Sequence, residues 1–309
     1  MRVAITGATG FIGRHICSLL ESPRYRVRAL ARDAVAARRA LAPGVEIVPG
    51  DIASPEALRA LVRDADAVLH LAGAVRGASR ADFDTANVDG SAALLAAMDA
   101  TAPGARLLFF SSLAAREPAL SHYAASKRRA EELLLARAGA RPLAILRPPA
   151  VYGPGDREML PVFRFMARTG LAPCAGRVSD RLSLIFVHDL ARAAEAWLEA
   201  PATPAATWSL HDGCDGGYDW TALCRIVGAA CGRAIRAWEI PRAPLDLVAR
   251  GNRALGRLLG RAPMLTPEKL NELRHPDWVC DNAAISAALD WRPRAQLAEG
   301  LLLTPGWRD

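Results

Sequence analysis

The feature that most constrains this chain is its first stretch, where a short apolar run leads into three regularly spaced glycines. Residues 3–5 predict a buried strand, Gly7, Gly10 and Gly13 follow, and apolar residues at helical spacing extend to position 20. Gly7 permits a tight turn, Gly10 lets a pyrophosphate approach the backbone, and Gly13 lets the helix lie close to the strand. The helix N-terminus adds free N–H groups. This order predicts a dinucleotide-binding site rather than a purely structural turn.

The rest of the first half alternates between strand and helix signals, which favours a parallel sheet covered by helices on both faces. Ser54-Pro55-Glu56 predicts a helix start, with an N-cap, a proline and an acid in the first turn. The expected strands after the first are residues 25–31, 45–48, 67–71, 107–111 and a segment that includes 144–146. Prolines at 148, 149 and 154 predict a domain boundary near residue 150.

A group of residues suited to proton transfer follows the strand at 107–111. Tyr123 and Lys127 are four residues apart, so they share one face of a helix, and Ser112 lies just past the strand. Reduction of a carbonyl by hydride requires a proton donor at the developing alkoxide. The reverse reaction, oxidation of an alcohol, requires a base at the same position. A free tyrosine titrates near 10, so to act as a base near pH 7 its pKa must fall by roughly 3 units, which corresponds to about 4 kcal/mol. A lysine ammonium about 5 Å away supplies roughly 3 kcal/mol of this at an effective dielectric near 20.

A Tyr-x-x-x-Lys pair alone is also a common surface pair on helices. Here the whole chain has two lysines, Lys127 and Lys269, among 39 basic residues. One of the two therefore falls at the position that the chemistry requires. We expect Ser112, Tyr123 and Lys127 to be catalytic, with Ser112 as the group that holds the substrate oxygen and the adjacent Ser111 as the alternative.

These motifs resemble the extended, epimerase/dehydratase-like branch of the short-chain dehydrogenase/reductase superfamily. The resemblance favours Ser112 over Ser111 as the serine that holds the substrate oxygen. The resemblance also includes residues 147–156, 186–191, 291–293 and 297–301, so it spans nearly the full length. It implies about seven strands in a doubly wound, mostly parallel α/β Rossmann sheet. It divides the chain into a dinucleotide-binding domain over 1–150, to which the chain returns around 183–210, and a smaller C-terminal α/β substrate lobe over 151–309. Besides the three glycines, the expected cofactor-binding residues are Thr9, Phe11, Ile12, Arg32, Asp51, Ile52, Leu71, Ala72, Gly73, Tyr123, Lys127, Pro148, Ala150 and Val151.

The end of the second strand bears on the choice of cofactor. NAD-binding sites usually place an acid there for the ribose 2′-hydroxyl, but this chain has Ala31 followed by Arg32. A guanidinium suits a 2′-phosphate. We therefore expect NADP, with NAD possible.

Three functions fit the motifs. The first is an NADP-dependent dehydrogenase or reductase of a small carbonyl/alcohol pair, with Tyr123 as general acid/base. The second is a nucleotide-sugar epimerase or dehydratase with a recycled cofactor. The missing acid at Ala31, Leu113 after Ser112, Ala150 where many such relatives have asparagine, and the short stretch between Ser112 and Tyr123 count against it. The third is a non-catalytic cofactor-binding accessory protein, which has no need of the Ser-Tyr-Lys group.

Composition limits the partners. The net charge is +7 without long basic runs, which predicts no nucleic-acid patch. No apolar run approaches about 18 residues, so we expect a cytoplasmic protein without a membrane partner. Six cysteines in no standard zinc pattern predict reduced thiols and no metal. A homodimer through helices near 85–100 and 121–138 is expected from the resemblance alone.

Several segments leave their roles open. Asn87 fits either a helix-bridging or a direct role beside the cofactor, and His188 reads as an ordinary residue at a helix start. Met159, Phe163 and Met166 share one helical face that could line a substrate pocket or belong to the core. Residues 241–275 predict helices interrupted by prolines and show no catalytic signature.

Overall fold

Seven parallel strands form the centre of the protein, in the order β11-β6-β5-β4-β1-β2-β3. The computed structural model describes residues 1–77, 79–202, 205–259 and 265–308. The strands of this sheet are β1 (Arg2–Thr6), β2 (Arg26–Ala31), β3 (Glu46–Pro49), β4 (Ala67–His70), β5 (Arg106–Phe110), β6 (Leu143–Arg147) and β11 (Ala206–Ser209). The predicted doubly wound fold is confirmed. The strand order reverses between β1 and β4, which is where such sheets bind ligands.

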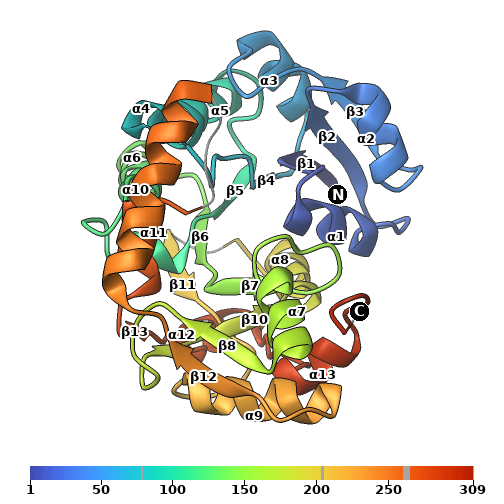
Figure 1. Cartoon of the computed structure of the whole chain (residues 1–309). Coiled ribbons are helices and arrows are strands. Elements are labelled where there is room, and N and C mark those ends of the chain that lie inside the picture. Colours follow the sequence, from blue (N-terminus) through green and yellow to red (C-terminus); the bar gives the residue numbers. More distant parts are fainter. Residues whose placement is uncertain (78, 203–204, 260–264, 309) are drawn as a thin grey trace.

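Helices cover both faces of this sheet (Figure 1). Those of the first half and the one that returns to the sheet are α1 (Phe11–Leu19), α2 (Ala34–Ala40), α3 (Pro55–Val62), α4 (Arg80–Asp84), the π-helical turn η1 (Thr85–Asp89), α5 (Gly90–Thr101), the 3₁₀ turn η2 (Leu113–Arg116), α6 (His122–Arg137) and α8 (Val187–Glu199). The helix predicted at Ser54 is α3, where the Ser54 side chain accepts from the Ala57 N–H.

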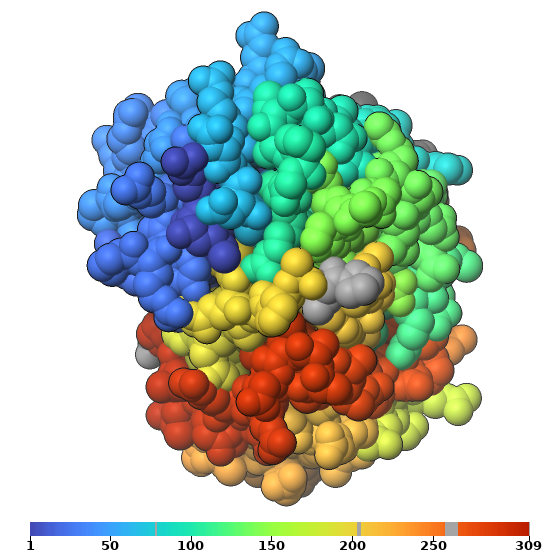
Figure 2. All heavy atoms as spheres, turned by 180° about the vertical axis from the view of Figure 1, so that it is seen from behind, coloured from blue at the N-terminus to red at the C-terminus, as the bar shows by residue number. Residues whose placement is uncertain are grey.

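The two faces of the sheet have separate hydrophobic cores because successive strand residues point to opposite sides. Val3 and Ile5 of β1 pack with α1 and α8, whereas Ala4 packs with α3 and α5. Residues from far along the chain, including Trp197 and Trp208, complete the first core. In Figure 2 the yellow segment that includes α8 lies between the blue N-terminal part and the red C-terminal part.

The second half builds a smaller group of elements around its own core, which contains Tyr152, Phe163 and Trp307. Its elements are β7 (Ala150–Tyr152), α7 (Leu160–Thr169), β8 (Leu171–Cys174), β9 (Arg181–Leu182), β10 (Leu184–Phe186), α9 (Trp220–Cys231), β12 (Arg236–Glu239), α10 (Arg242–Leu259), α11 (Pro267–Leu273), β13 (Asp277–Trp278), α12 (Ala283–Leu289) and α13 (Leu297–Leu302). Its strands form three parallel pairs, β7 with β10, β8 with β12 and β9 with β13.

The closing segment is fastened to α8 by one buried carboxylate. Asp189 accepts from the backbone N–H groups of Arg294 and Ala295 at 2.9 and 3.0 Å, and Arg192 pairs with it at 2.6 Å. The Trp291 indole donates to the Asp189 carbonyl oxygen at 3.2 Å. The C-terminal residues therefore return to the helix that covers α1.

Candidate active site

The glycine turn joins β1 to α1 in a form that side chains would block. Gly7 has φ of +73°, and a Cβ there would lie 2.7 Å from the Ala72 backbone nitrogen. A Cβ on Gly13 would lie 2.3 Å from the Gly7 carbonyl oxygen. The turn, the loop after β4 and the first turn of α1 are thus packed backbone against backbone, which only glycine permits.

The open side of this turn fits a pyrophosphate. Gly10 is exposed, and a Cβ there would meet only the Gly7 carbonyl oxygen, at 3.1 Å. Gly10 is also the N-cap of α1 and gives the helix no side-chain cap. The first N–H groups of α1, which starts with Phe11 and Ile12, therefore have no intrahelical acceptor and can receive an anion. Thr9 is exposed in the turn.

Ser112 and Tyr123 are brought together at the carboxyl end of β5. Tyr123 is the second residue of α6, whose N-cap Ser121 accepts from the Ala124 N–H at 2.9 Å. A hydrogen bond between the Ser112 and Tyr123 hydroxyls lowers the tyrosine pKa, but burial has the larger effect and raises it to about 12, with Glu272 and Glu158 adding to the rise. The phenol is therefore protonated at neutral pH and can act as a proton donor.

Lys127 is buried one turn further along α6. Its Nζ donates to the Phe110 carbonyl oxygen at 3.0 Å, and burial lowers the lysine pKa to about 8, against a smaller opposing effect of Glu131. We expected the ammonium to depress the tyrosine pKa, and the structure gives the opposite direction for Tyr123. The reason is that burial destabilises the phenolate by more than the hydrogen bond with Ser112 stabilises it.

Ser111 and Ser112 have different surroundings. Ser111 is buried and donates to Glu131, whose carboxylate also pairs with Arg147 through the Nε at 2.9 Å. Ser112 is partly exposed, and its Oγ accepts from the Ala114 N–H at 3.2 Å. The structure thus places Ser112, and not Ser111, next to Tyr123.

The segment after β4 reaches the same place. A Cβ on Gly73 would lie 2.4 Å from Asn87 Oδ1 and 3.3 Å from Lys127 Nζ, so Gly73 lets both side chains approach. Asn87 Oδ1 accepts from the Ala74 N–H at 2.8 Å, and its Nδ2 donates to Ser126 Oγ at 2.8 Å. Asn87 therefore bridges this loop to α6. It lies in the π-helical turn η1, and such turns often mark functional sites.

Arg32, which directly follows β2, has a side chain that is largely exposed to solvent. Its side chain is 85% exposed, with Nε 3.9 Å from an Asp51 carboxylate oxygen. Ala31 is buried, and the next acid, Asp33, is used to cap α2, accepting from Val35 and Ala36. The last residue of β2 is therefore an alanine where NAD-binding sites usually have an acid for the ribose hydroxyl. Ile52 packs against Gly90 of α5.

The residues after β6 lie at the carboxyl end of the sheet, beside the segment that carries Ser112. The Pro148 carbonyl oxygen accepts from the Leu113 N–H at 2.9 Å, which holds this segment beside Ser112. Ala150 and Val151 form β7 and pair with Leu184 and Ile185 of β10. Of the apolar face considered for a pocket, Phe163 and Met166 are fully buried in the core of the second half.

Sequence reasoning missed two carboxylates that affect Tyr123. Glu158 follows β7 and forms an ion pair with Arg76 from the loop after β4. Glu272 belongs to α11, accepts from the Ser121 hydroxyl and pairs with Lys269 at 2.9 Å. Both come from segments distant in the chain, and no local motif marks them.

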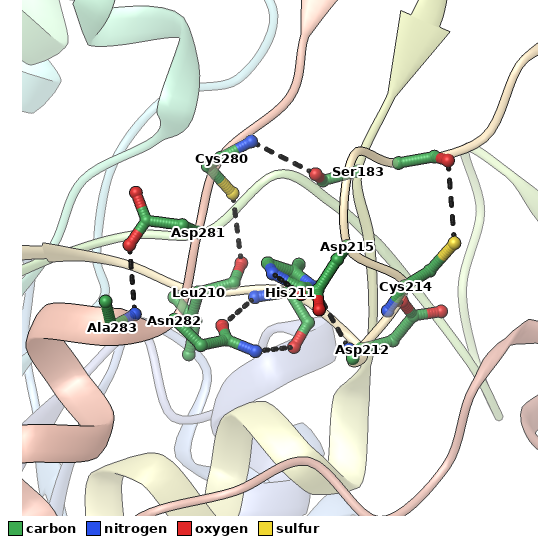
Figure 3. Close-up of polar contacts among 12 residues, drawn as sticks. Ser183, Leu210, His211, Asp212, Cys214, Asp215, Cys280, Asp281, Asn282 and Ala283 are labelled. Carbon is green, nitrogen blue, oxygen red and sulfur yellow. Dashed lines mark hydrogen bonds and ion pairs between the residues drawn. The ribbon is translucent and has the colours of Figure 1, made fainter.

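The segment around His211 is held by hydrogen bonds to the chain at 280–282 (Figure 3). The His211 N–H donates to Asn282 Oδ1 at 2.7 Å, and the Cys280 thiol donates to the Leu210 carbonyl oxygen at 3.5 Å. All six cysteines are free thiols. Within the described ranges, no three His, Cys, Asp or Glu side chains are placed to hold a metal ion.

The doubly wound sheet with a glycine turn at its switch point defines an α/β protein of the dinucleotide-binding class. The model of the NAD-dependent epimerase/dehydratase family matches residues 3–208. The chain belongs to this family and is an NAD(P)-dependent enzyme of the extended short-chain dehydrogenase/reductase type.

Among similar sequences, a ceramide reductase of Caulobacter vibrioides is 36% identical over 99% of this chain and 93% of that protein. A 2-alkyl-3-oxoalkanoate reductase of Stenotrophomonas maltophilia is 30% identical over 67% of this chain and 68% of that protein. Among solved structures, UDP-glucuronic acid 4-epimerase of Bacillus cereus in complex with UDP-glucuronic acid and NAD has a TM-score of 0.74 at 20% identity, covering 98% of this chain and 97% of that one. This last likeness concerns the fold alone.

Proposed function

We propose that this protein is an NADP-dependent reductase that converts a carbonyl group of a long-chain lipid to an alcohol. The observation that supports reduction is the group of Ser112, Tyr123 and Lys127 at the sheet edge that also holds the glycine turn. The lipid class rests on the names of two reductases that this chain resembles, a ceramide reductase and a 2-alkyl-3-oxoalkanoate reductase.

The proposed roles follow from the geometry. Gly10 and the N-terminus of α1 would hold the pyrophosphate, and Gly73 with Lys127 would line the nicotinamide end. When bound, the cofactor supplies the hydride. Ser112 donates a hydrogen bond to the substrate oxygen, and Tyr123, protonated because its pKa is raised to about 12, gives its proton to that oxygen as negative charge develops. Lys127 acts as a positioning residue through its bond to the Phe110 carbonyl oxygen.

The test of the function is NADPH oxidation by the purified protein with a panel of ketones, from short water-soluble ones to 3-oxo lipids in detergent micelles. We expect stoichiometric consumption of NADPH and a preference for the lipids. Tyr123→Phe should lower turnover by at least about 100-fold and leave NADPH affinity unchanged. Equal turnover in the variant, or substrate conversion without net NADPH consumption, would contradict the proposal; the second result would favour an epimerase.

The preference for NADP rests on Arg32. An exposed guanidinium at the end of β2 suits the 2′-phosphate, β2 ends in Ala31 rather than in an acid, and Asp33 caps α2 through its Oδ1. Arg32→Ala should weaken NADPH binding by about tenfold or more, since a charge-assisted contact is lost, and change NADH binding little. Fluorescence titration with both cofactors measures this. A similar loss for both, or for neither, would overturn the NADP assignment.

A further inference from the structure

Helix α10 has an outward face that nothing in the described part of the chain covers. Leu247, Val248 and Leu255 are 72%, 52% and 54% exposed, which is unusual for large apolar side chains. Pro244, Gly251 and Ala254 are exposed on the same side, because their spacing repeats that of a helix. The outward face, defined by these six residues, has no charged member.

The orientation of α10 is fixed by its opposite side. Asp246 pairs with Arg274 at 2.6 Å, and Arg253 pairs with Glu268 at 2.7 Å, so two ion pairs fasten the helix to α11 and the residue that follows it. Ala249, between them, is fully buried. In Figure 1 α10 runs along the outside of the molecule. The side of α10 that carries Asp246 and Arg253 packs against α11, so the apolar residues on the other side of the helix point away from the protein.

Charge indicates what the outward face meets. Between residues 242 and 259 the sequence has four arginines and one aspartate, a net charge of +3 in a chain of net charge +7. Arg242 and Arg250 are exposed, and Arg250 borders the outward face. An apolar stripe bordered by a basic residue, here Arg250, on a helix of net positive charge is typical of helices that lie in the interface of a bilayer, where anionic headgroups attract the basic side. A second copy would instead bring the same positive charge against it.

We propose that α10 docks this protein on the surface of a membrane that contains anionic lipids. No described helix is long and apolar enough to cross a membrane, so the attachment is peripheral. From the sequence we considered only membrane-spanning runs and expected no membrane partner, so this proposal differs from that expectation.

The docking helix is joined to the candidate active site. Asn271 of α11 donates to the Leu120 carbonyl oxygen at 3.2 Å, and Glu272 accepts from Ser121, the N-cap of the helix that presents Tyr123. If the proposed function holds, a lipid taken up where α10 meets the bilayer lies near the catalytic helix. The docking itself rests only on α10.

The test is flotation of the full-length protein with vesicles of phosphatidylcholine, with and without phosphatidylglycerol. We expect binding to the anionic vesicles that weakens at high salt. Leu247→Glu combined with Leu255→Glu should lower the bound fraction at least about tenfold, because apolar area is lost and negative charge is added. Leu302→Glu is the matched control, since Leu302 is 67% exposed on α13 and should bind as the wild type does.

Wild-type protein that stays with the soluble fraction, or a double variant that binds as well as the control, would overturn the docking proposal. So would loss of a dimer in the double variant by light scattering with vesicle binding unchanged, which would assign the face to a second copy. Turnover of a short water-soluble ketone should be equal in all variants. If no ketone is reduced but vesicles are still bound, the proposed function fails and the docking stands.

Discussion

At the residue scale, two adjacent serines at the end of β5 have different hydrogen-bond partners, and we expect them to have different functions. Ser112→Ala should lower kcat/KM by about 100-fold, because it removes the hydrogen-bond donor to the substrate oxygen. Ser111→Ala should leave kcat/KM within about threefold, because Glu131 keeps its pairing with Arg147. Steady-state kinetics of the two variants side by side measure this. Equal losses would show that the two hydroxyls are not distinguished as the structure places them.

Lys127 should couple the stability of the fold to pH. Its pKa is lowered from 10.5 to about 8, so between these values the unfolded chain binds the proton that the folded one releases. Stability contributed at this site therefore rises with pH, by up to about 3 kcal/mol between pH 8 and pH 10.5. Below pH 8 the buried ammonium destabilises the fold.

Urea unfolding of the wild type and of Lys127→Met across this range isolates the effect, since other titrations cancel in the difference. As pH rises from 8 to 10.5, the free energy of unfolding of the wild type should increase relative to that of the variant. Parallel curves would mean that the ammonium is not desolvated in the folded protein.

At the scale of elements, the strand–turn–helix unit depends on backbone contact that glycine allows. Gly13→Ala would place a Cβ 2.3 Å from the Gly7 carbonyl oxygen, which cannot move without distorting the turn. We expect at least a tenfold loss of NADPH affinity and a destabilisation of about 2 kcal/mol. Gly104→Ala, where a Cβ meets nothing within 4 Å, is the control for both titration calorimetry and urea unfolding. Wild-type affinity in Gly13→Ala would show that α1 can shift without cost.

At the scale of the whole molecule, the nucleotide-binding sheet does not complete itself within residues 1–150. Leu190, Ala194 and Trp197 of α8 cover α1, and Trp208 of β11 joins the same core. A fragment of residues 1–150 should therefore expose this face, bind a hydrophobic dye and unfold without a cooperative transition, whereas the full chain unfolds cooperatively. A sigmoidal urea curve for the fragment would show that the first 150 residues fold as an independent unit. The division at residue 150 and the expected homodimer stay predictions.

The sequence by itself determined the sheet, the glycine turn and the positions of Ser112, Tyr123 and Lys127, because these features depend on local spacing. Glycines at intervals of three, and a Tyr and a Lys one helical turn apart, are informative wherever the rest of the chain lies. The sequence also left the two roles of Asn87 open, and the tertiary structure shows it bridging the loop after β4 to α6.

Only the tertiary structure decided what surrounds Tyr123 and which side of α10 faces outward. Burial and the carboxylates Glu158 and Glu272 set the direction of the tyrosine pKa, and they come from segments that no spacing rule connects to it. Likewise, the pattern of residues 241–275 predicts helices but cannot say whether the apolar or the charged side of one packs inward. That choice depends on partners such as Arg274 and Glu268, which the fold brings to it.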